Sequence, residues 1–215
     1  LSALIRYILE EVPDLPQLRL SSLDPASIDE DFIDTFATEQ RLMPYAHLSI
    51  QSSSSAVLKA MRRRHSQEDL VALCQRLRMK RPDIALGADL IAGFPTEREE
   101  DFREMLHTLP TLGLTFLHVF PYSKRPGTLA ASMPDLPRSV VLDRARQLRF
   151  LKDQFLQQSL RQYVGQTITV VVERPNSGKT PQFIPVTWDR PSSPRTRLSM
   201  RIIGTHKNAL IAAYS

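Results

Sequence analysis

The chain has 215 residues, of which 42% are hydrophobic and 24% charged, and its formal net charge is +5. This is the composition of an ordinary globular protein with room for one large domain, or for one medium and one small domain. The single cysteine, Cys74, excludes a disulfide framework and a cluster held by several cysteines of this chain. With no bilayer-length apolar run and no signal-peptide pattern, we expect a cytoplasmic protein with no membrane contact.

Helical and extended patterns alternate from the start of the chain to residue 162. Apolar side chains at helical spacing predict helices over residues 2–11, 29–36, 55–61, 67–79, 97–112 and 139–162. Short apolar or alternating runs between them predict strands at residues 17–23, 47–51, 84–91 and 114–121. Repeated strand–helix units imply an α/β fold with a mainly parallel sheet, and four strands are fewer than a complete eight-unit barrel needs.

Residues 84–97 carry the clearest functional pattern. An apolar run that suits a strand buried on both faces leads into the turn Gly93-Phe94-Pro95-Thr96. Thr96, with Glu99 three residues later, predicts the start of a helix. Ligands bind at such strand–turn–helix junctions of α/β folds because free backbone N–H groups point outward there. An ordinary strand-to-helix turn is the alternative interpretation.

The pattern changes after Tyr163. Residue-by-residue alternation predicts a strand over residues 166–173, and further short strands are predicted at residues 182–188, 198–203 and 208–213. Four short strands without a helix suggest a small all-β barrel, so we divide the chain into domains 1–162 and 163–215. Basic side chains outnumber acidic ones in the second domain. They favour a polyanionic partner, with a generic soluble surface as the alternative.

Four stretches, in order along the chain, resemble the radical S-adenosylmethionine (SAM) methylthiotransferases: HLSIQS, LKAMRRRH, GADLIAGFPTEREEDF and LHVFPYSKRPGTLAASMP. The last stretch most resembles the branch that acts on threonylcarbamoyladenosine in tRNA. The resemblance implies an incomplete parallel (β/α) barrel of radical SAM type, followed by a TRAM-like RNA-binding β-barrel. It also implies an enzyme that adds a methylthio group to C2 of N6-threonylcarbamoyladenosine next to the anticodon, using S-adenosylmethionine and 4Fe-4S clusters.

The chain also departs from this family. The family holds its iron–sulfur clusters with cysteines of an N-terminal domain and of a loop at the start of its barrel, and Cys74 matches neither set. We therefore expect the C-terminal portion of such an enzyme, inactive alone, with a missing N-terminal portion as a candidate partner. An open sheet without its first strands should expose apolar edges and be poorly soluble. The family's usual Gln-Ser-Gly-Ser is Gln51-Ser52-Ser53-Ser54 here, so any positive φ of that glycine falls to Ser53, at a cost of about 1 kcal/mol.

The resemblance assigns roles to residues at the strand ends and in the loops that follow. Residues expected to contact S-adenosylmethionine are Ser49, Gln51, Arg63, Gly93, Phe94, Glu97, Phe120 and Tyr122. Residues expected to contact the substrate or a tRNA anticodon stem-loop are Asp89, Arg125, Arg174, Lys179, Arg195, Arg197 and Arg201. Structural roles compete with these assignments: Glu97 suits a helix cap, Asp89 suits the partner of a structural arginine, and His118 suits a core or barrel-lining group.

Two other functions are compatible with the sequence. A catalytically dead remnant of the same family would keep RNA affinity without catalysis. An unrelated barrel enzyme acting on a phosphorylated metabolite is the weaker hypothesis, because the sequence offers no recognisable nucleophile, metal-binding set or base for it.

Overall fold

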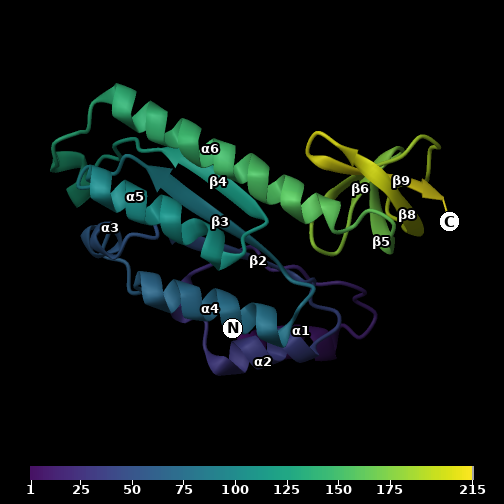
Figure 1. Ribbon diagram of the computed structural model, residues 1–215. Coiled ribbons are helices and arrows are strands. Elements are labelled where there is room, and N and C mark those ends of the chain that lie inside the picture. The colour runs from purple at the N-terminus through teal and green to yellow at the C-terminus, as the bar shows by residue number, and fades with distance from the viewer. Residues whose placement is uncertain (215) are drawn as a thin grey trace.

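The computed structural model describes residues 1–214 and places a parallel sheet beside a small closed barrel (Figure 1). The sheet has the order β1-β2-β3-β4. Its strands are β1 (Ser22–Leu23), β2 (Tyr45–Gln51), β3 (Ala85–Ala92) and β4 (Phe116–Pro121). All three neighbouring pairs are parallel, which confirms the predicted parallel sheet.

The first strand is shorter than the predicted span of residues 17–23. Only Ser22 and Leu23 pair with β2, because Leu18 instead exchanges backbone hydrogen bonds with Arg41 and Met43, in the segment that precedes β2. The edge of the sheet at β1 is therefore short.

Helices lie between the strands as predicted. They are α1 (Ser2–Glu11), α2 (Glu30–Thr38), α3 (Ser55–Ala60), α4 (Gln67–Lys80), α5 (Glu99–Thr108) and α6 (Arg138–Arg161), with 3-10 turns at Pro25–Ser27, Leu109–Leu112 and Leu129–Ser132. The predicted start of α5 at Thr96 is wrong. Its N-cap is Arg98, whose backbone N–H donates to Asp101 at 2.9 Å, because Glu97 is held in a turn by hydrogen bonds of its own. None of the helices within residues 1–214 has the length and apolarity that crossing a membrane requires.

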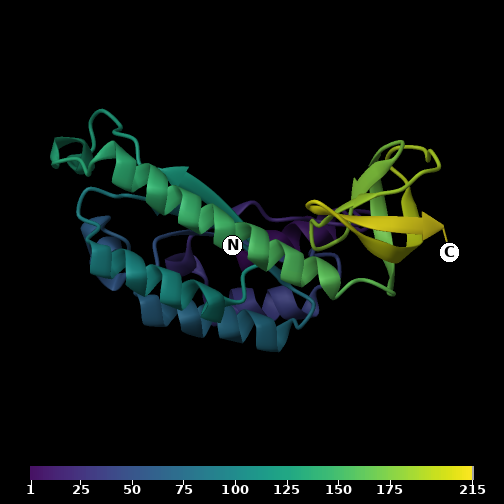
Figure 2. The ribbon, with the colours of Figure 1, turned by 45° about the horizontal axis from the view of Figure 1, so that its top comes forward.

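Helices cover only one face of the sheet (Figures 1 and 2). Leu86, Ala88 and Leu90 of β3 are fully buried in the main hydrophobic core, which the helices share. Asp89 and Ile91, which alternate with them, are only half-buried. The prediction that this strand is buried on both faces is therefore wrong, because right-handed crossovers place the helices of the described chain on one side.

The edge strand β4 is also more exposed than its apolar sequence suggests. His118 is exposed and Phe120 is 50% exposed, so the open face of the sheet does present apolar surface. The poor solubility expected from such a surface stays a prediction.

Residues 167–214 form a closed barrel with the strand order β5-β6-β7-β9-β8. Its strands are β5 (Thr167–Arg174), β6 (Ser177–Lys179), β7 (Pro185–Thr187), β8 (Arg197–His206) and β9 (Ala209–Tyr214). The strand missed by sequence reasoning, β6, has three residues centred on Gly178, where a Cβ would lie 2.1 Å from the carbonyl oxygen of Val171. Leu156 and Leu160 of α6 belong to the barrel core, so the domain boundary at residue 162 stays a prediction.

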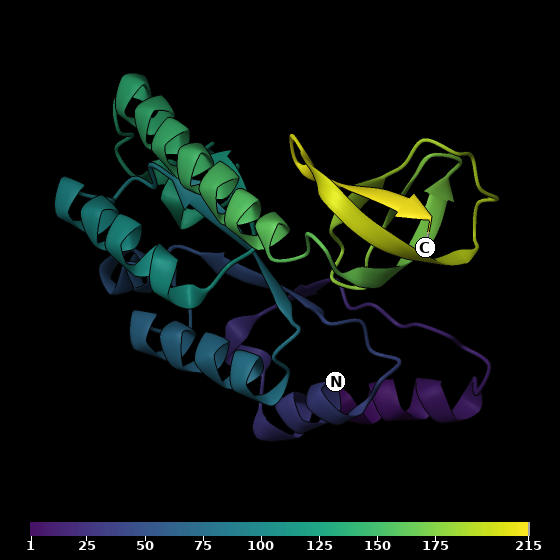
Figure 3. The same cartoon turned by 45° about the vertical axis from the view of Figure 1, so that its right-hand side comes forward.

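The barrel lies beside the sheet (Figure 3). Phe183, in the loop between β6 and β7, packs against Tyr45 at the amino-terminal end of the sheet. Its ring centroid lies 5.5 Å from that of Tyr45 at the start of β2. Two cations flank the same ring, with Arg19 Cζ at 3.6 Å and Lys179 Nζ at 3.3 Å from the centroid. Cation–π contacts of this kind stabilise by about 0.5–2 kcal/mol each. Phe183 therefore joins three segments that are distant in sequence.

The Phe183 contact predicts a measurable loss of stability on truncation. Phe183→Ala removes the ring from Tyr45, Arg19 and Lys179, and should lower the free energy of unfolding by about 1–3 kcal/mol in urea titrations. The matched control is Phe150→Ala on α6, where the side chain is 65% exposed and little change is expected. Equal effects of the two substitutions would contradict this role.

Candidate functional site

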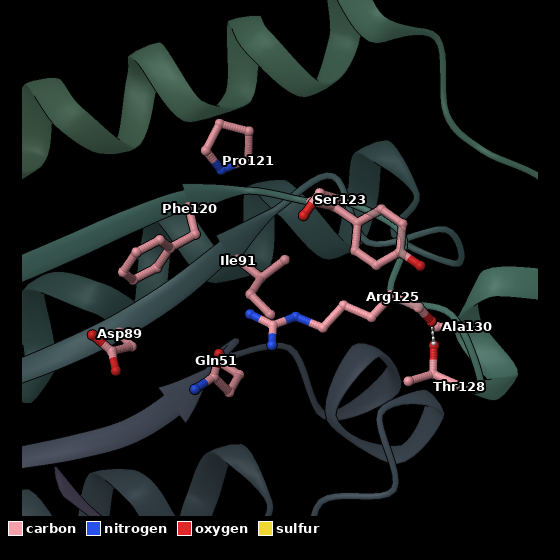
Figure 4. A pocket seen from close by; sticks show the side chains of 10 residues that line it. Gln51, Asp89, Ile91, Phe120, Pro121, Ser123, Arg125, Thr128 and Ala130 are labelled. Carbon is pink, nitrogen blue, oxygen red and sulfur yellow. Dashed lines mark hydrogen bonds between the residues drawn. The ribbon is translucent and has the colours of Figure 1, made fainter.

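The carboxyl ends of β2, β3 and β4 surround a cavity of about 480 Å³ (Figure 4). Gln51 ends β2, Ile91 lies near the end of β3, and Tyr122 follows β4, and all three line it. The parallel register sets Gln51 beside Leu90 and Ile91 beside Phe120, so the strands end at the same edge. The structure thus brings together the three strand ends that the sequence singled out.

A second cavity of about 510 Å³ adjoins the first on the side of α3. The two share Gln51, Ile91, Thr128 and Ala130 in their linings. Together they make a hollow of the size that small-molecule sites occupy, placed where ligands bind in open α/β sheets.

Gln51 carries backbone strain at this edge. Its φ is +72°, in the left-handed region that favours glycine, whereas Ser53 is not among the residues with positive φ. The prediction that Ser53 carries the positive φ is therefore wrong. The pairing of β2 with β3 shifts register between Leu48 and Gln51, and this irregularity places the turn at Gln51. Strain held at a cavity wall is typical of functional sites.

Gly93 and Glu97 lie behind the cavity and shape the loop between β3 and α5. The Glu97 carboxylate accepts hydrogen bonds from the Gly93 N–H at 2.9 Å and from the Arg144 guanidinium at 2.7 Å. Glu97 is 1% exposed, and these bonds join the loop to α6. Gly93 has φ +75°, and a Cβ there would lie 2.6 Å from Val141 of α6, so the glycine is needed for packing.

Phe94 and Tyr122 form a perpendicular aromatic pair with ring centroids 5.5 Å apart. Phe94 lines the second cavity and Tyr122 the first. The Tyr122 hydroxyl is buried and has no hydrogen-bond partner within residues 1–214. An unpaired buried hydroxyl is costly, so this atom is suited to a ligand's polar group.

Arg63 lines the second cavity and braces β2. Its guanidinium donates a short hydrogen bond to the carbonyl oxygen of Ser49, while its Nε is buried without a partner in the described chain. The hydroxyl of Ser49 is hydrogen-bonded to that of Ser22 on β1, and Ser49 does not line the first cavity. Phe120 does line it, from the exposed edge strand.

Asp89 lines the first cavity and pairs with a histidine that sequence reasoning did not single out. Its Oδ1 lies 2.9 Å from His47 Nε2, and His47 Nδ1 lies 2.9 Å from the hydroxyl of Tyr45. Of the two partners that the sequence left open for Asp89, a structural arginine is not found within residues 1–214, and the residue is only half-buried. The missed signal was the alternation along β2, which puts Tyr45, His47 and Ser49 on the same face as Asp89.

His118 lies on the same open face, where its ring meets that of His47 edge-on at 5.1 Å. Loss of hydration against the sheet and the nearby His47 lower the pKa of His118. Arg125 reaches over the cavity from the loop after β4, with its guanidinium directed toward Gln51 and Asp89 (Figure 4).

The basic residues assigned to RNA lie on the five-stranded barrel, away from this cavity. Arg174, Arg195, Arg197 and Arg201 are exposed and, within residues 1–214, none forms an ion pair. Arg197 and Arg201 lie on β8 at positions of the same alternation as exposed Ser199. Lys179 differs, because its ammonium lies on the Phe183 ring and 3.7 Å from Glu173.

The residues of this chain do not fit an iron–sulfur cluster. Cys74 is fully buried in α4, and burial raises the pKa of its thiol to about 12, which disfavours the thiolate that a metal requires. Among residues 1–214, no three His, Cys, Asp or Glu side chains are grouped to hold a metal ion.

The chain is similar to known proteins over most of its length. Residues 4–109 match the model of the Radical SAM superfamily. The chain is 41% identical to threonylcarbamoyladenosine tRNA methylthiotransferase MtaB of Rickettsia prowazekii, over 87% of this chain and 44% of that protein. It is 34% identical to tRNA-2-methylthio-N(6)-dimethylallyladenosine synthase of Bartonella bacilliformis, over 95% of this chain and 46% of that protein. Coproporphyrinogen III oxidase (HemN) of Escherichia coli, a radical SAM enzyme, shares the fold with a TM-score of 0.59 at 22% identity, over 72% of this chain and 37% of that one.

The parallel sheet and these matches define the chain as part of a radical SAM barrel. Within that superfamily, the matches to these relatives support the radical SAM methylthiotransferase family, which is a family of enzymes. The chain spans less than half the length of the curated relatives it matches here.

The strain at Gln51 predicts that substitution by glycine and substitution by alanine will change the stability by different amounts. Gln51→Gly relieves the positive φ, whereas Gln51→Ala removes the amide but keeps the Cβ. The glycine variant should be about 1 kcal/mol more stable than the alanine variant in urea unfolding, because glycine adopts this region at no steric cost. A glycine variant less stable than the alanine variant would contradict the assignment of strain.

The buried Glu97–Arg144 pair predicts a pH-dependent defect. Arg144→Met leaves the Glu97 carboxylate uncompensated, and should lower the free energy of unfolding by about 3–5 kcal/mol near neutral pH. Burial raises the pKa of Glu97 above its unfolded value, so below the unfolded pKa the carboxyl is protonated in both states and the part of the cost that comes from the buried charge disappears. The cost then grows as pH rises through the folded pKa.

Urea unfolding of Arg144→Met at about pH 4 and about pH 7 measures this dependence. The control is the double variant Glu97→Leu/Arg144→Met, which removes the buried charge and should recover most of the loss at about pH 7. An equal loss at the two pH values, or no recovery in the double variant, would contradict a buried ion pair in which Arg144 compensates the charge of Glu97.

Proposed function

We propose that this chain is the C-terminal part of a tRNA methylthiotransferase that adds a methylthio group to C2 of N6-threonylcarbamoyladenosine next to the anticodon. The observation that carries the proposal is the hollow at the carboxyl edge of the sheet, lined by Gln51, Ile91 and Tyr122 from three neighbouring strands. A radical SAM family member is expected to hold its cofactor and substrate at this edge.

The hollow fits one side of an S-adenosylmethionine site. Ile91 and Phe94 give an apolar surface for a base, and the amide of Gln51 gives donors and an acceptor for polar groups. Two buried polar atoms without partners in the described chain, Tyr122 Oη and Arg63 Nε, lie on residues that line the two cavities. When bound, the cofactor supplies the radical and the methyl group, and these residues would bind and orient it.

The chemistry of the first cavity favours a charged N6 substituent on the substrate base. Arg125 lies over the cavity without an ion pair in residues 1–214, and a guanidinium binds carboxylates in a fixed, bidentate geometry. A threonylcarbamoyl group carries a carboxylate and a dimethylallyl group does not. Arg125 therefore supports the threonylcarbamoyl substrate, in line with the name of the relative from Rickettsia prowazekii.

We assign the five-stranded barrel as a TRAM-like domain that binds the tRNA anticodon stem-loop. Its exposed arginines at positions 174, 195, 197 and 201 can neutralise phosphates. The barrel packs at the amino-terminal end of the sheet and the cavity lies at the carboxyl end. A bound stem-loop would therefore extend along the molecule to bring its base to the cavity.

The clusters would come from a polypeptide segment that precedes these residues in the relatives, or from a partner that supplies it. This chain alone is proposed to have no radical chemistry, because its residues do not fit a cluster. Anaerobic reconstitution with iron and sulfide tests this point. Stoichiometric cluster uptake by the 215-residue chain would contradict it.

An RNA-binding remnant without catalysis is the second candidate function. The same buried Cys74 and the same basic barrel favour it. The two candidates differ at the carboxyl edge, since a remnant has no need to bind S-adenosylmethionine or to keep strain at Gln51.

The basic barrel predicts salt-dependent RNA binding. Arg197→Ala and Arg201→Ala should each weaken binding of a tRNA anticodon stem-loop and lower the slope of log K against log salt by about 1, because each removes one phosphate contact. Arg103→Ala on α5, where the guanidinium pairs with Glu99, is the matched control and should leave the slope unchanged. Absence of binding at low salt, or binding without a salt slope, would count against any RNA role.

A further inference from the structure

A hydrogen-bonded row of three side chains crosses the open face of the sheet and ends in the first cavity. It runs from the Tyr45 hydroxyl to His47 Nδ1 at 2.9 Å, and from His47 Nε2 to Asp89 Oδ1 at 2.9 Å. None of the roles proposed above uses Tyr45 or His47. Asp89 is the member that lines the cavity.

The chemistry of the three groups gives the row a direction. An ionised carboxylate can only accept, so His47 Nε2–H donates to Asp89. In its neutral form, the imidazole then accepts at Nδ1, and the Tyr45 hydroxyl is the donor. Burial raises the pKa of Tyr45 to about 12, so the hydroxyl keeps its proton. One oxygen of Asp89 is thereby occupied and its position fixed.

The surrounding packing holds the row in place. The Tyr45 ring meets Phe116 edge-on at 5.8 Å and Phe183 at 5.5 Å, and the His47 ring meets His118 edge-on at 5.1 Å. Gly87 of β3 leaves the space for the Tyr45 hydroxyl, because a Cβ there would lie 2.6 Å from that oxygen. A larger residue at this position would displace Tyr45 from His47.

The second oxygen of Asp89 has no hydrogen-bond partner in the described part of the chain, and Asp89 lies on the cavity with Arg125. The carboxylate and the guanidinium do not pair with each other, since no ion pair joins them within residues 1–214. A cavity with one free acceptor and one free cation complements a ligand that carries an N–H donor beside an anionic group.

We propose that Tyr45 and His47 are positioning residues that hold Asp89 so that its free oxygen accepts a hydrogen bond from an N–H of the substrate's N6 substituent, while Arg125 binds the carboxylate of the same substituent. The inference rests on the proposed function and adds to it the residues that would determine substrate specificity. Its ligand class is a nucleoside whose N6 group carries both an N–H and a carboxylate. Asp89 touches the substrate, and the other two residues act through it.

The test compares two nucleosides on the 215-residue chain by calorimetry: N6-threonylcarbamoyladenosine and unmodified adenosine. The wild-type chain should prefer the modified nucleoside by about tenfold or more, since a site built to hydrogen-bond a group rejects the analogue that lacks it. Asp89→Asn should remove most of that preference. Tyr45→Phe and Gly87→Ala should each reduce the preference by severalfold. The matched controls Asp14→Asn and Tyr7→Phe, both at exposed positions, should change nothing.

A spectroscopic readout separates positioning from general destabilisation. Long-range proton–nitrogen NMR of the wild-type chain should show His47 as the neutral Nε2–H tautomer. Tyr45→Phe should change the Nδ1 shift while the shifts of exposed His107 stay fixed. A His47 that is protonated on Nδ1 alone would overturn the row as described.

The binding outcomes distinguish this inference from the proposed function. A wild-type preference for the modified nucleoside that survives Asp89→Asn would overturn the role of Asp89 and leave the proposed function standing. A wild-type chain that binds both nucleosides equally, or neither, would overturn the substrate assignment and this inference with it.

Discussion

The parallel register of β2, β3 and β4 is the constraint on which the site depends. Because the strands are hydrogen-bonded side by side in the same direction, their carboxyl ends reach one edge, and Gln51, Ile91 and Tyr122 meet there although they are distant in sequence. The helices bury the other face of the same strands. Alternation along each strand therefore assigns one set of side chains to the core and the next set to the cavity.

Alternate side chains of a strand therefore contribute to the stability of the core or to the cavity. Buried Leu86, Ala88 and Leu90 hold β3 against the helices, while Asp89 and Ile91, which alternate with them, face the open side. Behind this edge of the sheet, the Glu97–Arg144 ion pair and the close packing of Gly93 on Val141 fix the turn between β3 and α5. The cavity wall is thus supported by packing and ion pairing behind it, which is how a precise site is held on a rigid scaffold.

The sequence predicts the helices and strands whose signals are local. It does not predict the features that tertiary contacts determine. The four parallel strands and six helices follow from periodicity and breakers, and the strand ends follow from them. The true start of α5 depends on the Glu97 bonds, and strand β6 has only three residues, so neither has a clear local signal. The Tyr45–His47–Asp89 row joins two strands, and only the register shows it. The strain lies at Gln51 because of a register shift that composition does not encode.

The central claim is that the edge formed by these three strand ends binds the adenosyl cofactor. The most direct measurement is a titration of the chain with S-adenosylmethionine followed by backbone amide NMR shifts. The account predicts that the largest shifts cluster at Gln51, at 91–94 and at Tyr122. Shifts confined to the separate cavity beside Asp83 and Tyr163 at the opposite end of the sheet, or no shifts at saturating cofactor, would contradict it.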